Sequence, residues 1–226
     1  MKKNIFLCVC ALFLITGCFK NSTKDIRVNI NKTKGLSYDY AVTNDGIALA
    51  ITNDTKSNID FISVDMAVYD TNNNLISVEK QSIHNLDSKQ TNVIKISYSD
   101  TSYSNKQIKP SKVEIATTPV NYENKVEVSY ADKVEGTVSK TEIESELALL
   151  IKNNSGVVLN NLNAAVVFYK KSKIVDVYLV SATEVENEYT DMVYLPVAQS
   201  NDKTTKYIDY DDVKVIINNA ATYNNM

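Results

Sequence analysis

Cysteine and histidine, which supply most metal ligands and many catalytic groups in proteins, are nearly missing from this chain. It has three cysteines and one histidine in 226 residues. Cys8 and Cys10 lie in an apolar N-terminal segment, so the chain beyond that segment keeps only Cys18. This excludes an internal disulfide, a thiolate metal site and a cysteine nucleophile there. A fold without disulfides depends on burial alone, which favours folding units of about 90 residues or more.

The single histidine, His84, gives no support for catalysis or zinc binding. It lies in a polar stretch (81–85), where we expect a surface side chain. A zinc site needs three or four suitable ligands, and a nucleophilic triad needs a base held beside a serine or cysteine. The sequence has no G-x-S-x-G elbow, and its five glycines form no phosphate-binding loop. We therefore expect no catalytic residue, no metal and no cofactor.

A strong charge of one sign is also missing. The formal net charge is −3, and loss of Lys2 and Lys3 with the N-terminal segment would make it −5. A mildly acidic protein has no electrostatic reason to bind nucleic acid or an anionic membrane surface. We therefore expect no nucleic-acid partner.

The first eighteen residues have the pattern of an export signal. Lys2 and Lys3 precede an unbroken apolar run of eleven residues (5–15), and small residues follow it. A positive start, an apolar run and a small-residue site are typical of a cleaved signal peptide. The run is too short to cross a bilayer core of about 30 Å, which takes about 20 helical residues.

The end of this segment, Leu-Ile-Thr-Gly-Cys at positions 14–18, resembles the lipobox of bacterial lipoproteins. The resemblance implies that Ile15, Thr16 and Gly17 form the recognition site, that residues 1–17 are removed, and that Cys18 receives the lipid. Several acyl chains on one cysteine would anchor the protein stably, at about 0.8 kcal/mol per buried methylene. The expected location is the cell membrane, facing outside the cytoplasm. The alternative is a plain signal peptide cut near Gly17, which would release a soluble protein.

Beyond this segment the sequence repeats with an offset of one hundred residues. Residues 48–53 (ALAITN) match 148–153 (ALLIKN), and residues 66–69 (MAVY) match 166–169 (VVFY). A period of this length is too long for a solenoid, so the repeat predicts two tandem domains, at 24–120 and 121–226, after a tether at 18–23. The other matched pairs are Ile26, Val28 and Ile30 with Val126, Val128 and Tyr130, then Val93 with Val193, Ile108 with Ile208, Val113 with Val213 and Ile115 with Val215.

Both copies have the pattern of β-strands. Short segments of alternating apolar and polar residues are bounded by Asn, Asp, Ser and Gly clusters. Residues 46–52 and 147–151 are denser apolar runs, as expected of central strands packed on a core. About six or seven strands per copy predict an all-β fold of two tandem immunoglobulin-like β-sandwich domains after the signal peptide. The other expected strands are 27–30, 62–69, 75–80, 93–98 and 113–117, then 126–130, 162–169, 174–180, 193–197 and 213–217.

Met-Ala-Val-Tyr-Asp at 66–70, after a strand that ends at Asn53, resembles the FxLYD domain family. The second copy offers Val-Val-Phe-Tyr-Lys at 166–170. In both copies an aliphatic residue replaces the motif's phenylalanine, and in the second copy Lys170 replaces its aspartate. The resemblance implies an extracellular immunoglobulin-like module that is common in bacterial lipoproteins and has no assigned chemistry.

Acidic and tyrosine side chains of the second copy make a candidate binding surface. The alternating glutamates at 184–188 would share one face of a strand and could help bind a cation or a basic partner. A solvated strand face is the alternative. Tyrosines suit recognition of sugars or peptides, although ordinary strand tyrosines are also common. The candidate residues are Glu184, Glu186, Glu188, Asp209, Asp211 and Asp212, together with Tyr189, Tyr194, Tyr207 and Tyr210.

The first copy holds a segment that begins like a calcium loop. Residues 70–74 (DTNNN) place oxygen ligands at alternate positions, but Leu75 and Gln81 stand where such a loop needs glycine and glutamate. A hairpin turn is the alternative interpretation. The paired Tyr69 and Tyr169 are expected as core or corner residues whose hydroxyls reach the backbone.

Charge is unevenly shared between the copies. Residues 24–120 carry 11 basic and 11 acidic side chains, whereas residues 121–226 carry 10 and 16. We expect the acidic second copy to lie away from the membrane, and the whole chain to be a non-enzymatic, lipid-anchored envelope protein that binds a protein or cell-wall partner. One alternative is a structural stalk or accessory subunit of an envelope complex. The other is a metal-dependent hydrolase built on the acidic residues.

Overall fold

The computed structural model describes residues 26–43, 46–98, 110–121, 127–188, 190–201 and 204–223. The expected signal peptide, Cys18, the tether and Ile108 lie outside these ranges, and so does Tyr189. Within them, every regular element is a strand except one short 3-10 helix (Ala131–Lys133). This part of the chain contains no helix that is both long enough and apolar enough to span a membrane.

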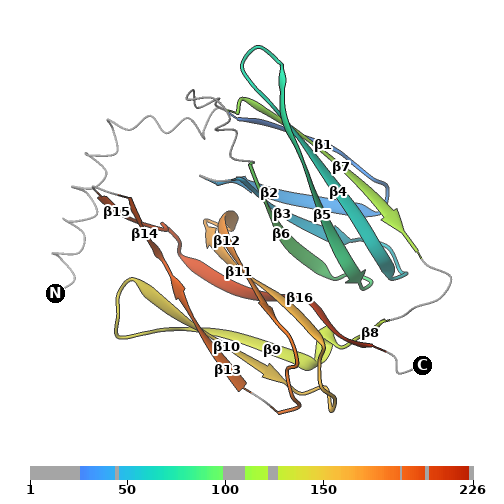
Figure 1. Cartoon of the computed structure of the whole chain (residues 1–226), viewed down its shortest axis with the longest axis vertical. Coiled ribbons are helices and arrows are strands. Elements are labelled where there is room, and N and C mark those ends of the chain that lie inside the picture. The colour runs from blue at the N-terminus through green and yellow to red at the C-terminus, as the bar shows by residue number, and fades with distance from the viewer. Residues whose placement is uncertain are drawn as a thin grey trace.

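The strands form two immunoglobulin-like β-sandwich domains (Figure 1). The first domain consists of β1 (Arg27–Asn31), β2 (Leu36–Val42), β3 (Gly46–Asn53), β4 (Ile59–Tyr69), β5 (Leu75–Leu86), β6 (Thr91–Ser97) and β7 (Lys112–Val120). Its sheet 1 has the order β1-β7-β4-β5, and its sheet 2 has the order β2-β3-β6. Neighbouring strands are antiparallel except β1 and β7, which are parallel.

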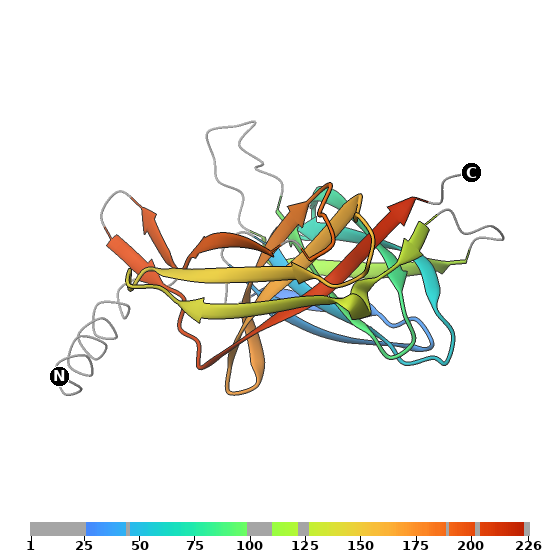
Figure 2. The same ribbon diagram turned by 90° about the horizontal axis from the view of Figure 1, so that it is seen from below.

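The second domain repeats this plan and adds a hairpin. It consists of β8 (Glu127–Ser129), β9 (Val134–Lys140), β10 (Glu146–Asn153), β11 (Asn161–Lys170), β12 (Lys173–Ala182), β13 (Thr190–Pro196), β14 (Ala198–Asn201), β15 (Thr204–Tyr207) and β16 (Asp212–Tyr223). Sheet 3 has the order β12-β11-β16-β8, and sheet 4 has the order β13-β10-β9. The added β14–β15 hairpin lies at the end of the domain opposite the last residues of β16 (Figures 1 and 2).

Alternation of apolar residues builds the core of each sandwich, as the sequence predicts. On β4, Ile62, Val64, Met66 and Val68 are fully buried and face sheet 2, whereas the residues between them are partly exposed. The second core is centred on Phe168, whose ring makes edge-to-face contacts with Tyr178 and Tyr210, at centroid distances of 5.7 and 5.1 Å. The predicted fold class is confirmed.

The two domains pack face to face, so the four sheets form one stack in the order 1, 2, 3, 4. The outer face of sheet 2 meets the outer face of sheet 3 in a third apolar cluster. Figure 1 shows the stack running from sheet 1 at the upper right to sheet 4 at the lower left. The residues of this cluster are Ala41, Ala48, Ala50 and Val93 from the first domain and Ala165, Val167, Ile174 and Val177 from the second, with Tyr169 and Ile216 at its margin.

The repeat has an offset of one hundred residues only in its central strands. β3 and β10 span 46–53 and 146–153. Val93 pairs with Ala50, but Val193 pairs with Leu149, so the match of Val93 with Val193 is wrong by one residue. The counterpart of Val93 is Met192, since Met192 pairs with Leu150. A one-residue shift moves a side chain to the opposite face of its strand, so this correction decides which residues correspond.

The first strands of the two copies also differ. β1 runs parallel to the beginning of β7, with Val28 opposite Val113. β8 runs antiparallel to the end of β16, with Val128 opposite Thr222. Val28 and Val128 therefore occupy different places, and their sequence match is wrong.

Four strands were not predicted: β2, its counterpart β9, and the two strands of the added hairpin, β14 and β15. In β9, a glycine in the middle of the segment suggests a turn, although Gly136 pairs with Ile151 within the sheet. A Cβ atom at position 136 would lie only 2.3 Å from Cγ1 of Val215. Glycine is therefore required here by the close approach of the facing sheet rather than by a turn.

Candidate functional site

A buried asparagine anchors the same loop in each domain. Asn53 and Asn153 end β3 and β10 and are fully buried. The side-chain amide of Asn153 donates to the carbonyls of Val157, Val185 and Glu186 at 2.9 to 3.0 Å. Asn53 donates in the same way to two carbonyls of its own domain. These contacts satisfy buried backbone acceptors, so we assign both asparagines a structural role.

The segment that begins like a calcium loop is a hairpin turn. One carboxylate oxygen of Asp70 accepts the backbone N–H groups of Asn72 and Asn74, both at 2.8 Å, and the other accepts the Asn74 amide at 3.0 Å. Asn73 has a φ of 64°, which asparagine tolerates in such turns. The hydrogen bonds from Asn74 and Asn72 lower the pKa of Asp70. Both oxygens of the Asp70 carboxylate therefore accept hydrogen bonds from residues of the same turn.

A lysine covers the paired tyrosine in each domain. The Lys112 ammonium lies 4.2 Å from the ring centroid of Tyr69, and the Lys214 ammonium lies 5.4 Å from that of Tyr169. The Tyr69 hydroxyl donates to a carboxylate oxygen of Glu114 at 3.1 Å, so the expected bond from this hydroxyl to the backbone is wrong. That hydrogen bond raises the pKa of Tyr69.

Two hollows lie beside these tyrosines, one in each domain. The first has a volume of about 380 Å³ and is lined by Arg27, Asp70, Thr71, Asn73, Ser111 and Lys112. The second has a volume of about 160 Å³ and is lined by Tyr169, Ser172, Asp211, Asp212 and Lys214. Ligand pockets usually hold about 300 to 1,000 Å³ and are mostly apolar. The second hollow is smaller than this, and the first has a suitable volume but is lined by polar and charged side chains, so neither resembles such a pocket.

The predicted acidic surface is not one surface. Glu184, Glu186 and Glu188 lie in a loop rather than a strand, because Glu184 and Glu188 have φ values of 55° and 61°. This loop is fixed by Val185, which is buried and forms a bridge with Leu159. The three glutamates therefore do not share a strand face, and that prediction is wrong.

The predicted aspartates lie at the other end of the same sandwich. The Asp211 N–H bonds to the carbonyl of Tyr169, near the end of β11, whereas Val185 lies near the start of that strand. About eight residues at roughly 3.3 Å each separate these two ends. Asp209 forms an ion pair with Lys170 at 2.7 Å. Among the described residues, no group of three His, Cys, Asp or Glu side chains could hold a metal ion.

The predicted tyrosines divide between surface and core. Tyr207 is exposed at the end of β15. Tyr210 is half-buried, and its ring packs on Phe168 of the second core. His84 is an exposed residue of β5 whose ring contacts the edge of Phe61, as expected for a surface histidine.

A network of buried and partly buried polar contacts joins the two domains, and we call this region the junction. Asn218, on β16, donates to the carbonyl of Val93 at 2.6 Å and accepts the Val93 N–H at 2.8 Å. Asn92 donates to the carbonyl of Asn218 at 2.7 Å, and Gln90 donates to that of Ile217 at 3.1 Å. These bonds tie an edge of sheet 2 to a strand of sheet 3.

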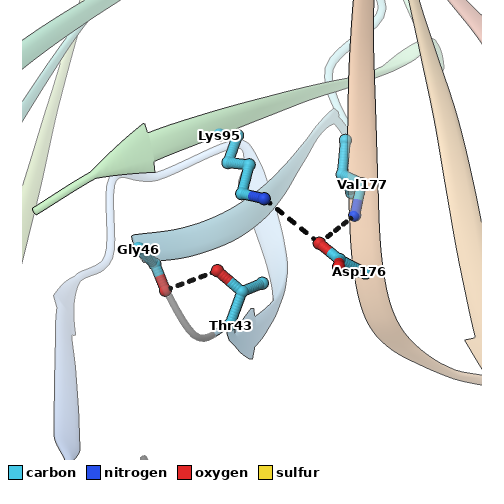
Figure 3. A network of polar contacts seen from close by, with 5 residues as sticks. All are labelled: Thr43, Gly46, Lys95, Asp176 and Val177. Carbon is cyan, nitrogen blue, oxygen red and sulfur yellow. Dashed lines mark hydrogen bonds and ion pairs between the residues drawn. The ribbon is translucent and has the colours of Figure 1, made fainter. Parts of the chain in front are cut away.

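An ion pair completes the junction (Figure 3). The Lys95 ammonium lies 3.2 Å from a carboxylate oxygen of Asp176, and the side chains are 15% and 13% exposed. The same oxygen accepts the Val177 N–H at 2.8 Å. Beside the pair, the Thr43 hydroxyl donates to the carbonyl of Gly46, the first residue of β3. Both charges are largely withdrawn from water and are held in one geometry.

Sequence reasoning missed this junction. Its one readable signal is the run at 46–52, which is apolar at nearly every position because β3 is buried on both faces. Ile47, Leu49 and Ile51 face the first core, whereas Ala48 and Ala50 face the second domain. No sequence pattern marks Asn218, since isolated asparagines are common throughout the chain.

Comparison with known proteins adds little to this description. The sequence matches no protein-family model and no curated protein. One similar solved structure is red sea bream transglutaminase, with 10% identity and a TM-score of 0.24 over 73% of this chain and 27% of that one. The chain thus spans about a quarter of the transglutaminase. Another is native alpha-2-macroglobulin from Escherichia coli spanning domains NIE-MG1, with 7% identity and a TM-score of 0.21 over 76% of this chain and 88% of that one.

Proposed function

We propose that this protein is a non-enzymatic, lipid-anchored module of the cell envelope that binds a protein or cell-wall partner outside the cytoplasm. The lipid is carried by Cys18, and the two domains act as one body. The resemblance of residues 14–18 to a lipobox and of residues 66–70 to the FxLYD domain supports the location and the class of module.

The observation that carries the proposal is the junction between the domains. Tandem domains in one chain usually move relative to each other unless their interface is large and apolar. Here an apolar cluster, a largely buried ion pair and the paired hydrogen bonds of Asn218 hold two sandwiches together. A body with fixed outer faces presents contact surfaces at little entropic cost on binding, which suits a binding module.

The anchor and the binding role are tested by two readouts on intact cells. We expect the wild-type chain to incorporate labelled palmitate and to sediment with membranes, and Cys18→Ala to lose both properties. Membrane retention of unlabelled Cys18→Ala would contradict the anchor. We also expect crosslinking to capture one dominant partner, or purified cell wall to retain the protein. The binding role would be contradicted if the wild-type protein neither crosslinked to one dominant partner nor was retained by cell wall.

The junction favours a second candidate as well, a structural stalk or accessory subunit of an envelope complex. A fixed two-domain body can hold a neighbouring subunit at a set distance from the membrane. A stalk should co-purify with one fixed assembly only when Cys18 anchors it, whereas a wall-binding module should be retained by cell wall even as Cys18→Ala.

A further inference from the structure

The junction between the domains uses two faces, and the repeat provides a second copy of each. The outer face of sheet 2, centred on Ala48 and Ala50, packs on the outer face of sheet 3, centred on Val167 and Val177. By the repeat, sheet 4 corresponds to sheet 2, and sheet 1 corresponds to sheet 3. Sheets 1 and 4 are the two ends of the stack, and their outer faces cover nothing else in the described chain.

The outer face of sheet 1 carries apolar counterparts of the sheet 3 residues of the junction. Val78 pairs with Ala67 as Val177 pairs with Val167, and Leu75 pairs with Tyr69 as Ile174 pairs with Tyr169. Both hairpins carry a bulge at the same place, so the correspondence is secure. Ile174 and Val177 are buried in the junction at 5% and 0% exposure, whereas Leu75 and Val78 are 57% and 52% exposed.

The outer face of sheet 4 carries the counterparts of the sheet 2 residues of the junction. Ala148 and Leu150 stand where Ala48 and Ala50 stand on the equivalent strand. Tyr194 pairs with Ala148 as Lys95 pairs with Ala48, so Tyr194 is the counterpart of the junction lysine. Leu150 is 38% exposed and Tyr194 is 60% exposed. Both side chains therefore lie exposed on a face whose equivalent in the first domain is covered by the junction.

We propose that the outer face of sheet 4 binds the outer face of sheet 1 of a second copy of this chain. The occupant is inferred from the established junction, in which the equivalent face of the first domain is covered by the equivalent face of the second. The contact continues the existing stack of sheets from one molecule to the next. Because the two faces differ, the contact is heterologous and can extend beyond a dimer.

The contact between copies is weaker than the junction within the chain. The counterpart of Asp176 is Ser77, whose hydroxyl is buried and has no hydrogen-bond partner among the described residues. A tyrosine and a serine therefore replace the Lys95–Asp176 ion pair, and no unpaired charge is created there. The counterpart of Ala165 is Asp65, which keeps Lys80 as its partner at 3.5 Å. β7 also has no bulge like the one that presents Asn218 on β16.

Site-specific photocrosslinking tests the contact in the full chain on intact cells. With p-benzoylphenylalanine at position 194, we expect crosslinked dimers and longer ladders, and peptide mapping should join residue 194 to the 75–80 segment of another copy. The same probe at Leu179, an exposed residue outside both faces, should give no ladder. Crosslinks from 194 to sheet 4 of another copy, to a different protein only, or to nothing would overturn the proposal.

A charge exchange separates a specific contact from loss of folding. We expect Val78→Lys and Leu150→Glu, as single changes, each to lower the ladder yield roughly tenfold, because each places an unpaired charge in the contact. The double variant should recover the ladder, since Val78 and Leu150 are the counterparts of Val177 and Ala50, which pack in one cluster at the junction, and the two introduced charges are therefore close together. Equal far-UV circular dichroism and thermal midpoints would show that all three variants fold. Folded variants in which the double change does not restore the ladder would contradict the proposed pairing.

Discussion

The ammonium of Lys95 in the first domain and the carboxylate of Asp176 in the second lie 3.2 Å apart and are both largely buried. The two residues lie 81 positions apart in the sequence, and they join sheets of different domains. A buried ion pair of this kind contributes less through its own attraction than through the penalty for removing one partner. We therefore expect this penalty to disfavour arrangements of the two domains that separate the two charges.

Removing one charge of this pair should lower the free energy of unfolding strongly, whereas removing both charges should lower it only slightly. We expect Lys95→Met to lower the free energy of unfolding by about 3 kcal/mol, because the Asp176 carboxylate stays desolvated without its partner. The double variant Lys95→Met/Asp176→Leu should recover most of that loss. Urea unfolding followed by circular dichroism measures both. Asp176→Leu alone completes the double-mutant cycle, and a double-variant loss equal to the sum of the two single losses would show that the pair is not coupled.

Asn218→Ala should weaken the junction without disturbing either core. The change leaves the N–H and the carbonyl of Val93 buried and unpaired, at about 1–3 kcal/mol for each group. We expect a loss of about 2–4 kcal/mol in the free energy of unfolding. Asn72→Ala, at an exposed turn position, is the matched control and should change stability by less than about 0.5 kcal/mol. A loss no larger than that of the control would exclude a clamping role for Asn218.

Replacing the buried Asn153 by aspartate should make stability depend on pH. Three carbonyl oxygens surround the side-chain amide, so a carboxylate there has its pKa raised above the ordinary value by burial and by repulsion from these oxygens. A folded-state pKa above the unfolded one means that stability is highest below about pH 4 and falls as pH rises through the folded-state pKa. Asn153→Ala, measured beside it, should lose a similar amount at every pH. Parallel pH profiles for the two variants would contradict this account.

The pKa of Tyr169 should show whether the two domains meet at the junction. Burial is the largest cause of the raised pKa of this phenol. The negative charges of Asp39, which lies across the junction, and of Asp212 raise the pKa further. The stability linked to Tyr169 is therefore fully present below the ordinary pKa of about 10 and is lost as pH rises through the folded-state pKa. Absorbance at 295 nm, with Tyr169→Phe to identify the signal, measures the titration. We expect Asp39→Asn to lower the pKa but to leave it raised, and no change with Asp39→Asn would mean that the domains do not meet there.

Local sequence pattern was sufficient to predict the fold of each copy and insufficient to predict their arrangement. Period-two alternation in β4 and β11 and the dense runs at β3 and β10 predict strands because side-chain direction is set by the strand itself. The junction depends on Val93, Asn218 and Asp176, whose partners are far away in the chain. Pairing over such distances is decided by shape and register, which no local pattern encodes.

The candidate surface was misjudged for the same reason. Evenly spaced glutamates at 184–188 indicate one strand face only if the backbone stays extended, and two of them instead adopt left-handed conformations. Tyr210 follows a polar stretch, yet the turn into β16 directs its ring onto Phe168. The hairpin turn at Asp70 was among the alternatives, because asparagines there favour a turn by their own chemistry.

The junction has a consequence for how the chain is made. The first domain is complete at Val120, but the face formed by Ala48 and Ala50 is covered only after β16 has been added, with Ile216 and Asn218 close to the end of the chain. At about 5–20 residues per second, the ribosome needs on the order of 5–20 s to add the roughly one hundred residues from Val120 to Asn218. If the first domain folds before the second has followed it, its outer sheet face stays uncovered during that interval. A chaperone that shields this sheet would act on the newly made protein and would lose access to the sheet once the second domain has folded against it.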